Sequence, residues 1–250
     1  MYVERAADGV PGAVVWIRTG GTGGPYRVLP DGCMDLIWSS GTLLVAGPDT
    51  RAHLGQDAPG AEHAALRFAP GQGAVLLGVP AVELRDTRVP LDALWPTAEA
   101  RRLAERIGEA ADRGAVLERV AGRLLARAEP PEPYLPAVVR GLRAGRSVAE
   151  VSAAAGVGER TLHRRSLAVF GYGPKTLARV LRMNRALELV REGRPFAEVA
   201  ALAGYADQAH LSRDVKALAG VPLGRLSRAD GQGDRAAASP GADGQGERAA

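Results

Sequence analysis

Two stretches of ten residues, 48 positions apart, are near copies of one another, with six identical positions. They cover 148–157 and 196–205, and the identical pairs are Ala149/Ala197, Glu150/Glu198, Val151/Val199, Ala153/Ala201, Ala155/Ala203 and Gly156/Gly204. Each copy is predicted to be a short helix that ends at a glycine turn and is followed by a more polar helix. That order is the sequence form of a helix-turn-helix, present twice. Two copies indicate a protein that reads two neighbouring segments of DNA major groove.

Charge is distributed unevenly along the chain. Residues 134–228 hold 16 Lys and Arg against 7 Asp and Glu, whereas the whole chain holds 32 against 28. The C-terminal part is therefore basic and the remainder mildly acidic, as expected for a nucleic-acid module joined to a domain of another kind. A chain of 250 residues is long enough for two domains, each with its own core.

Several classes of protein are excluded by what the sequence lacks. Cys33 is the only cysteine, so no internal disulfide or Cys-rich zinc site can form. No apolar run reaches the roughly 18–20 residues of a membrane span. The N-terminal residues do not have the pattern of a signal peptide. We therefore expect a soluble cytoplasmic protein without a membrane partner.

The expected fold class is α+β, in two domains. Strands are predicted at 13–19, 26–29, 34–39, 43–46, 64–68 and 74–79, with a polar loop over 47–62. They favour a small β-barrel or sandwich. The apolar spacing over 97–127 predicts two antiparallel helices, which either form a dimer seam or pack on the β domain.

A proline-rich stretch is expected to separate the two domains. With four prolines between Ala128 and Pro136, the segment 129–136 is predicted to be a non-helical linker. It would join a β-rich domain over 1–128 to an all-helical domain over 137–228. The segment 229–250 has no apolar period and is predicted to be a disordered tail.

In the first repeat, Ser147 and Glu150 form a capping box, and Gly156 supplies a left-handed turn. The next helix is expected to begin near Glu159, with Leu162 turned inward. Its outward residues, which are available to DNA, are Arg160, Thr161, His163 and Arg164.

In the second repeat, Pro195 is placed at the start of the first helix and Asp207 caps the second. The outward residues of the second helix are Gln208, Ala209, Ser212 and Arg213. Gln, Ser and Arg side chains hydrogen-bond base edges, and Arg is best suited to guanine.

A long helix is predicted between the repeats, over Pro174–Glu192. Nineteen residues at 1.5 Å each span roughly 28 Å. Successive major grooves on one face of DNA lie about 34 Å apart. Such a helix would hold two reading heads near the required spacing, with slight bending of the DNA.

Four motifs carry a family resemblance: RTLHRR at 160–165, FGYGP at 170–174, GYADQAHLSR at 204–213 and AGVP at 219–222. With them, residues 137–226 resemble the DNA-binding domain of the AraC/XylS family of bacterial transcription regulators. The resemblance implies seven helices, with two helix-turn-helix units joined by one long helix, and base-facing residues among those given above. Ser166 and Val215 depart from it, since the family usually has a core aromatic there. Gly158 replaces the usual Ser or Thr cap, which predicts a less rigid first unit.

The N-terminal half resembles, more weakly, a sensor-like domain of unassigned function that often precedes AraC-type units. The motifs are LPDGCMDLI at 29–37, LRFAPG at 66–71 and VPLDALW at 89–95. This resemblance implies a cupin-like β structure with a role in effector sensing or dimerisation, and it specifies no ligand.

Several N-terminal residues allow two interpretations. Aromatic residues either line an effector pocket or fill the core; they are Trp16, Tyr26, Trp38 and Trp95. Arg67 pairs with an anionic ligand or with a buried partner such as Asp35. Cys33 is a redox sensor or a small buried hydrophobe.

No metal site is expected, because only His53 and His63 remain for the N-terminal domain and a metal enzyme of this shape needs three or four ligands. His53 is expected on a solvated loop. No cofactor and no catalytic residue is expected either.

The sequence therefore predicts a transcription regulator that binds double-stranded promoter DNA, contacts RNA polymerase, and responds through its N-terminal domain to a small-molecule effector or by forming a homodimer. Two alternatives remain open. The N-terminal domain could be a small enzyme or ligand-storage domain, or the chain could be an architectural DNA-binding protein without an effector.

Overall fold

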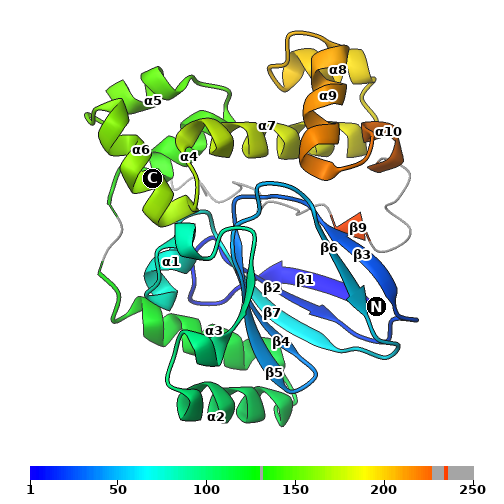
Figure 1. The fold of residues 1–250 in the computed structure, drawn as a ribbon, viewed down its shortest axis with the longest axis vertical. Coiled ribbons are helices and arrows are strands. Elements are labelled where there is room, and N and C mark those ends of the chain that lie inside the picture. The colour runs from blue at the N-terminus through cyan, green and yellow to red at the C-terminus, as the bar shows by residue number, and fades with distance from the viewer. Residues whose placement is uncertain (130–131, 227–233, 236–250) are drawn as a thin grey trace, which may run out of the picture.

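The computed structural model describes residues 1–129, 132–226 and 234–235, and places a β domain beneath a layer of helices (Figure 1). The chain thus has a mixed α+β architecture, with an antiparallel β domain first and helices after it. One long helix crosses above the β domain, with a group of helices at each of its ends.

Two sheets form the β domain. The larger has the order β1-β2-β7-β4-β5-β8, with β1 Tyr2–Ala6, β2 Val14–Arg18, β7 His63–Phe68, β4 Met34–Ser39, β5 Thr42–Ala46 and β8 Arg88–Pro90. All its neighbouring strands are antiparallel. The smaller sheet has the order β6-β3-β9, with β6 His53–Asp57, β3 Gly24–Val28 and β9 Asp234–Arg235. The described strands therefore form two sheets, and of the predicted barrel or sandwich they do not show a closed barrel.

The two faces of the larger sheet have different partners because side chains alternate along a strand. In β4, Met34, Leu36 and Trp38 are buried in the main apolar core. This face is covered by α1 Gln72–Leu77, α2 Thr97–Gly108 and α3 Arg113–Leu125. The alternate residues, such as Asp35 and Ile37, face the smaller sheet across a cavity.

The apolar residues of α2 and α3 pack against the larger sheet. All the buried apolar residues of the two helices, among them Leu103, Ile107 and Leu117, belong to the core cluster on the sheet. The structure therefore favours the expectation that the hairpin packs on the β domain over the expectation that it forms a dimer seam.

Two local expectations were wrong in the β domain. The run 74–79, predicted as a strand, lies mostly in α1, which begins after Gly71 and ends before Gly78, both in left-handed conformation. An apolar run of about six residues does not distinguish a strand from a helix by its period. The predicted polar loop over 47–62 contains β6, whose exposed and half-buried residues alternate without an apolar side.

Seven helices follow within residues 132–226, as the family resemblance implies. They are α4 Leu135–Arg143, α5 Val148–Ala154, α6 Glu159–Phe170, α7 Pro174–Arg191, α8 Phe196–Leu202, α9 Gln208–Ala219 and α10 Leu223–Leu226. The predicted linker ends earlier than expected, because α4 begins at Leu135 and accepts Pro136 in its first turn, where the missing N–H has no partner to lose. Most of 229–250, the predicted tail, lies outside the described residues; only β9 is described there.

The long helix α7 is shared by two apolar cores. Leu177 and Val180, in its first half, pack with α4, α5 and α6. Met183 and Leu187, in its second half, pack with α8, α9 and α10. Each helix-turn-helix unit is therefore anchored to one half of the same continuous helix.

The loop between β3 and β4 connects the β domain to this helix. Leu29 is buried in the core of the second helix-turn-helix unit. The Asn184 side chain of α7 donates a hydrogen bond to the Pro30 carbonyl oxygen, at 3.0 Å. At Gly32, an added Cβ would lie 3.6 Å from the Tyr172 hydroxyl oxygen, in the turn between α6 and α7.

The β domain also contacts the end of α9. The Ala52 amide donates to the Leu218 carbonyl oxygen at 2.6 Å, and the Arg27 guanidinium donates to the Ala219 carbonyl oxygen at 2.7 Å. A cation at this position complements the negative end of the helix dipole. The two domains are thus joined by buried polar and apolar contacts at more than one place.

Candidate DNA interface and effector pocket

The first helix-turn-helix unit is built by local rules that the sequence displays. The Ser147 side chain accepts from the Glu150 amide, and the Glu150 carboxylate accepts from the Ser147 amide, which completes the predicted capping box. Gly156 has φ +66 and turns the chain after α5. Gly158 stands at the N-cap of α6 without a side-chain hydrogen bond, so the start of this reading helix is held less firmly than an Asp or Ser cap would hold it.

The structure turns the expected DNA-facing side of α6 outward. Arg160, His163 and Arg164 are exposed and Thr161 is half-buried. Within the described residues, neither Arg160 nor Arg164 has a hydrogen bond or ion pair. The His163 ring lies over the turn that follows α6, because an added Cβ at Gly173 would come within 2.7 Å of its Nε2 atom.

The second unit presents a matching surface. The Asp207 side chain caps α9 by accepting from the His210 amide at 2.6 Å, as predicted. The four residues expected to face DNA, Gln208, Ala209, Ser212 and Arg213, are all exposed. Gly204, with φ +78, makes the turn between α8 and α9.

An ion-pair cluster that the sequence analysis missed fixes α9 on α7. Asp214 is buried and accepts hydrogen bonds from Arg179 at 2.6 Å and from Arg182 at 3.1 Å. Burial would raise the pKa of Asp214, but the two guanidinium groups outweigh it and lower that pKa. Because Asp214 follows Arg213 directly, this cluster positions the segment of α9 that carries the proposed reading arginine.

Ser166 occupies a fully buried position in α6 and its hydroxyl has no hydrogen-bond partner among the described residues. We expect Ser166→Ala to raise the free energy of unfolding by about 1 kcal/mol, because an unsatisfied buried hydroxyl is removed with little loss of volume. Thermal denaturation measures this, and Ser212→Ala, at an exposed position of α9, serves as the control. A lower melting temperature for Ser166→Ala would contradict the expectation.

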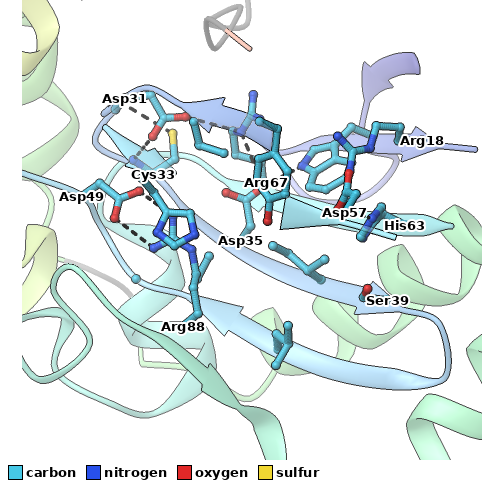
Figure 2. Close-up of a pocket in the computed structure, with 18 of the residues that line it drawn as sticks. Arg18, Asp31, Cys33, Asp35, Ser39, Asp49, Asp57, His63, Arg67 and Arg88 are labelled. Carbon is cyan, nitrogen blue, oxygen red and sulfur yellow. Dashed lines mark hydrogen bonds and ion pairs between the residues drawn. The ribbon is translucent and has the colours of Figure 1, made fainter. Parts of the chain in front are cut away.

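The β domain encloses a cavity of about 260 Å³ between the two sheets (Figure 2). Three groups of charged side chains line it. Arg67 lies near Asp31 and Asp35, with Nε–oxygen distances of 3.4 and 3.5 Å. The other two groups are Arg88 with Asp49, and Arg18 with Asp57 and His63.

The structure separates the residues that were expected to line a pocket. Trp16, Tyr26 and Arg67 line the cavity. Trp38 does not: it lies on the opposite face of the sheet, and its Nε1 atom donates to the Ala104 carbonyl oxygen of α2 at 3.0 Å. The expectation for Trp38 is therefore corrected, because the two-residue period of β4 turns Trp38 away from the side that bears Asp35.

The position of Tyr26 depends on the glycine opposite it. Tyr26 pairs with Gly55 in the smaller sheet, and an added Cβ at Gly55 would come within 2.2 Å of the Tyr26 ring. The ring therefore lies across β6, which only glycine allows at that position. Among the described contacts, the Arg18 guanidinium lies 5.2 Å from the centre of this ring.

His53 and Cys33 also belong to the cavity wall, and the structure bears on what the sequence predicted for each of them. His53 is not on a solvated loop: it begins β6 and lines the cavity, and burial lowers its pKa. Cys33 is half-buried and also lines the cavity. Burial and the nearby Asp31 raise the pKa of the Cys33 thiol well above its ordinary value, which favours the neutral thiol over a reactive thiolate.

Two kinds of feature are absent from the described residues. No group of three or more His, Cys, Asp or Glu residues in that part of the chain is arranged to hold a metal ion. Among the described helices, none combines the length and the apolar composition needed to cross a bilayer.

Two helix-turn-helix units on one continuous helix define a DNA-binding protein. In agreement, residues 151–229 match the family described as a helix-turn-helix domain, and residues 13–90 match a domain of unknown function (DUF6597). The C-terminal domain is an AraC-type DNA-binding domain, and the chain is a DNA-binding transcriptional regulator.

Solved structures similar to this chain include ToxT from Vibrio cholerae. An apo ToxT variant is 10% identical, with 90% of this chain and 99% of that chain covered and a TM-score of 0.48. ToxT bound to an unsaturated fatty acid is 10% identical, with 94% and 98% covered and a TM-score of 0.44. No curated protein sequence matches the chain.

Proposed function

We propose that the protein binds a specific operator by placing α6 and α9 in two successive major grooves. The continuous helix α7 supports this most directly, because it carries one reading helix at each end (Figure 1). Its 18 residues span about 27 Å, and the grooves lie about 34 Å apart. Slight bending of the DNA closes this difference.

The base-reading residues proposed are the outward ones of the two helices: Arg160, Thr161, His163 and Arg164 on α6, and Gln208, Ala209, Ser212 and Arg213 on α9. Other arginines of the basic domain bind phosphates and supply most of the affinity. Because the partner is promoter DNA, the protein acts in the cytoplasm of a bacterial cell, where RNA polymerase is within its reach.

Selection of bound fragments from random DNA, followed by methylation interference, tests this proposal. We expect a selected sequence with two contacted segments in the major groove, about 10–10.5 bp apart from centre to centre. A single contacted segment, or the absence of any enriched sequence, would contradict it.

We further propose that the cavity of the β domain binds the effector. The loop between β3 and β4 supports this, because Asp31 and Cys33 line the cavity while Pro30 and Gly32 contact the DNA-binding domain. A ligand that moves this loop acts directly on α7 and on the turn that precedes it. The presence of a cavity disfavours the architectural alternative, which expects a solid core.

A matched pair of glycine variants tests the connection through this loop. Gly32 has φ +84 and faces Leu177 at 3.3 Å, whereas Gly41 has φ +92 with nothing within 4 Å. We expect Gly32→Ala to change operator affinity by about 0.5–2 kcal/mol, a typical size for variants that alter coupling between sites. Gly41→Ala carries a similar backbone strain and is expected to leave the affinity unchanged. Equal effects in a fluorescence-anisotropy titration would reject the loop as the connection.

The alternative of a small enzyme required a buried pocket with two converging ionisable groups. Asp31 and Asp35 do converge, but both lie beside the Arg67 guanidinium. Burial raises the pKa of Asp31 and the guanidinium opposes this effect, so the geometry gives Asp31 the role of an ion-pair partner rather than of a free general base. The arrangement therefore supports ligand binding better than catalysis.

A further inference from the structure

The charges that line the cavity do not balance. Two of the three groups do: Arg88 forms a two-point ion pair with Asp49, at 2.9 and 2.6 Å, and Arg18 pairs with Asp57, which also contacts His63. In the third group, Arg67 is the one cation beside two carboxylates, Asp31 and Asp35. His53 adds no compensating charge, because burial lowers its pKa. Counted over the arginines and aspartates of the described wall, three cations face four carboxylates.

The third group is also poorly supplied with hydrogen bonds. The Arg67 side chain is 7% exposed, and its Nε and Nη1 atoms have no hydrogen-bond partner among the residues that the structure describes. The hydrogen bonds recorded for the carboxylates come from the Cys33 amide to Asp31 and from the Trp16 indole to Asp35. Each carboxylate has about four acceptor sites. The group therefore has unused donors on Arg67 that are shielded from water, where they are costly. The carboxylates, 14% and 15% exposed, have unused acceptors that face the cavity.

A ligand of complementary chemistry would satisfy both needs. We infer that the cavity binds a small organic cation, a protonated amine that also carries a hydroxyl or carbonyl oxygen. Its ammonium group lies against Asp31 and Asp35, and its oxygen accepts from the Arg67 guanidinium. Trp16 and Tyr26, which also line the cavity, provide aromatic surface for the body of the ligand. A cavity of about 260 Å³ limits the ligand to a small molecule.

The charged side chains of the cavity also argue against an anionic effector. A carboxylate ligand would bring a second unbalanced negative charge next to Asp31 and Asp35, and the three arginines of the cavity already have carboxylate partners. Like charges in a site of low dielectric repel strongly. This inference rests on the proposed effector role of the cavity, and the experiments below separate the two.

The charge imbalance itself is tested without a ligand. Asp31→Asn keeps the acceptor for the Cys33 amide and removes the surplus charge, so the unliganded protein is expected to melt several degrees higher at pH 7. Glu109→Gln, which removes an exposed carboxylate from the C-cap of α2, is the control and is expected to raise the melting temperature much less, because only an exposed charge at a helix end is relieved. A lower melting temperature for Asp31→Asn would overturn the argument.

Three probes that share a phenol ring and a two-carbon side chain test the class of ligand. The side chain ends in an ammonium group in tyramine, in a hydroxyl group in tyrosol and in a carboxylate in 4-hydroxyphenylacetate. Titration calorimetry on the full chain is expected to show tyramine binding at least ten-fold more tightly than tyrosol, and no binding of the carboxylate. Asp35→Asn is expected to weaken tyramine at least ten-fold, and Glu109→Gln to leave it unchanged. The inference is overturned if the carboxylate binds as well as the amine, if none of the three binds, or if Asp35→Asn has no effect.

Operator binding, measured with and without tyramine, distinguishes this inference from the proposed effector role. If tyramine binds through Asp35 but operator affinity stays constant, the ligand class stands and the effector role fails. If tyramine fails to bind while Gly32→Ala changes operator affinity, the connection between the domains stands and the ligand class fails.

Discussion

Replacing Arg164 and Arg213 together by alanine is expected to weaken operator binding by about 2–6 kcal/mol. Each arginine that reads a base contributes about 1–3 kcal/mol. The two losses should add, because α6 and α9 lie at opposite ends of α7 and their side chains share no partner (Figure 1). No other pair of substitutions on the outward faces is expected to cost more, since Arg to guanine is the commonest specific contact.

The measurement is a titration of the operator and of a scrambled duplex with the double variant and with both single variants. Arg119→Ala, at an exposed site on α3, is the control for a general loss of positive charge. Base reading requires the operator to lose much more affinity than the scrambled duplex. Equal losses on both duplexes would assign the arginines to phosphates, and unchanged operator affinity would place the reading surface elsewhere.

Most of the DNA-binding domain could be predicted from the sequence because its elements are set by neighbours in the chain. The capping box at Ser147, the cap at Asp207 and the turn at Gly156 each depend on residues within about four positions. Pro174 begins α7 by the same kind of rule. Local signals of this type can be recognised in a single sequence before the fold is known.

The cavity could be predicted only in part, because it depends on pairing between distant strands. Trp16 and Trp38 look alike in sequence, and only the register of β2, β7 and β4 puts them on opposite faces of the sheet. Of the two partners considered for Arg67, the structure places Asp35 beside it, because the two residues are opposite each other in neighbouring strands. Asp31 was missed because it lies in the loop before β4 and approaches Arg67 through the fold rather than through a strand register.

The ion pairs at α9 could not be predicted for the same reason, since they join residues that are far apart in the sequence. Asp214 reads as one more charged residue on a polar helix, yet it is buried against α7 by two arginines that are 32 and 35 positions away. The contacts between the domains, such as those of Leu29 and Asn184, join residues that are still further apart in the sequence. Such pairs leave no periodic pattern, so they become visible only when the helices are packed.

Removing Arg67 is expected to cause the largest loss of stability among the single substitutions considered. Arg67→Met fills much of the same space but leaves Asp31 and Asp35 without a cation in a buried site, and breaking a buried ion pair in this way costs about 3–5 kcal/mol. Chemical denaturation at pH 7 measures the loss. Adding Asp31→Asn to Arg67→Met should restore part of it, and a double variant no more stable than Arg67→Met would contradict this account.

The pH dependence of the same variants has a definite sign. Burial raises the pKa of Asp31 above its ordinary value even with Arg67 present, so the folded protein holds this proton more tightly than the unfolded chain does. The group therefore costs stability at neutral pH, and the cost disappears as the pH falls through the raised pKa. Because the charge of Arg67 lowers the pKa of Asp31, removing Arg67 raises that pKa further. The deficit of Arg67→Met relative to the wild-type protein should accordingly be greatest at neutral pH and shrink as the solution is acidified, whereas a deficit caused by lost packing would stay constant with pH.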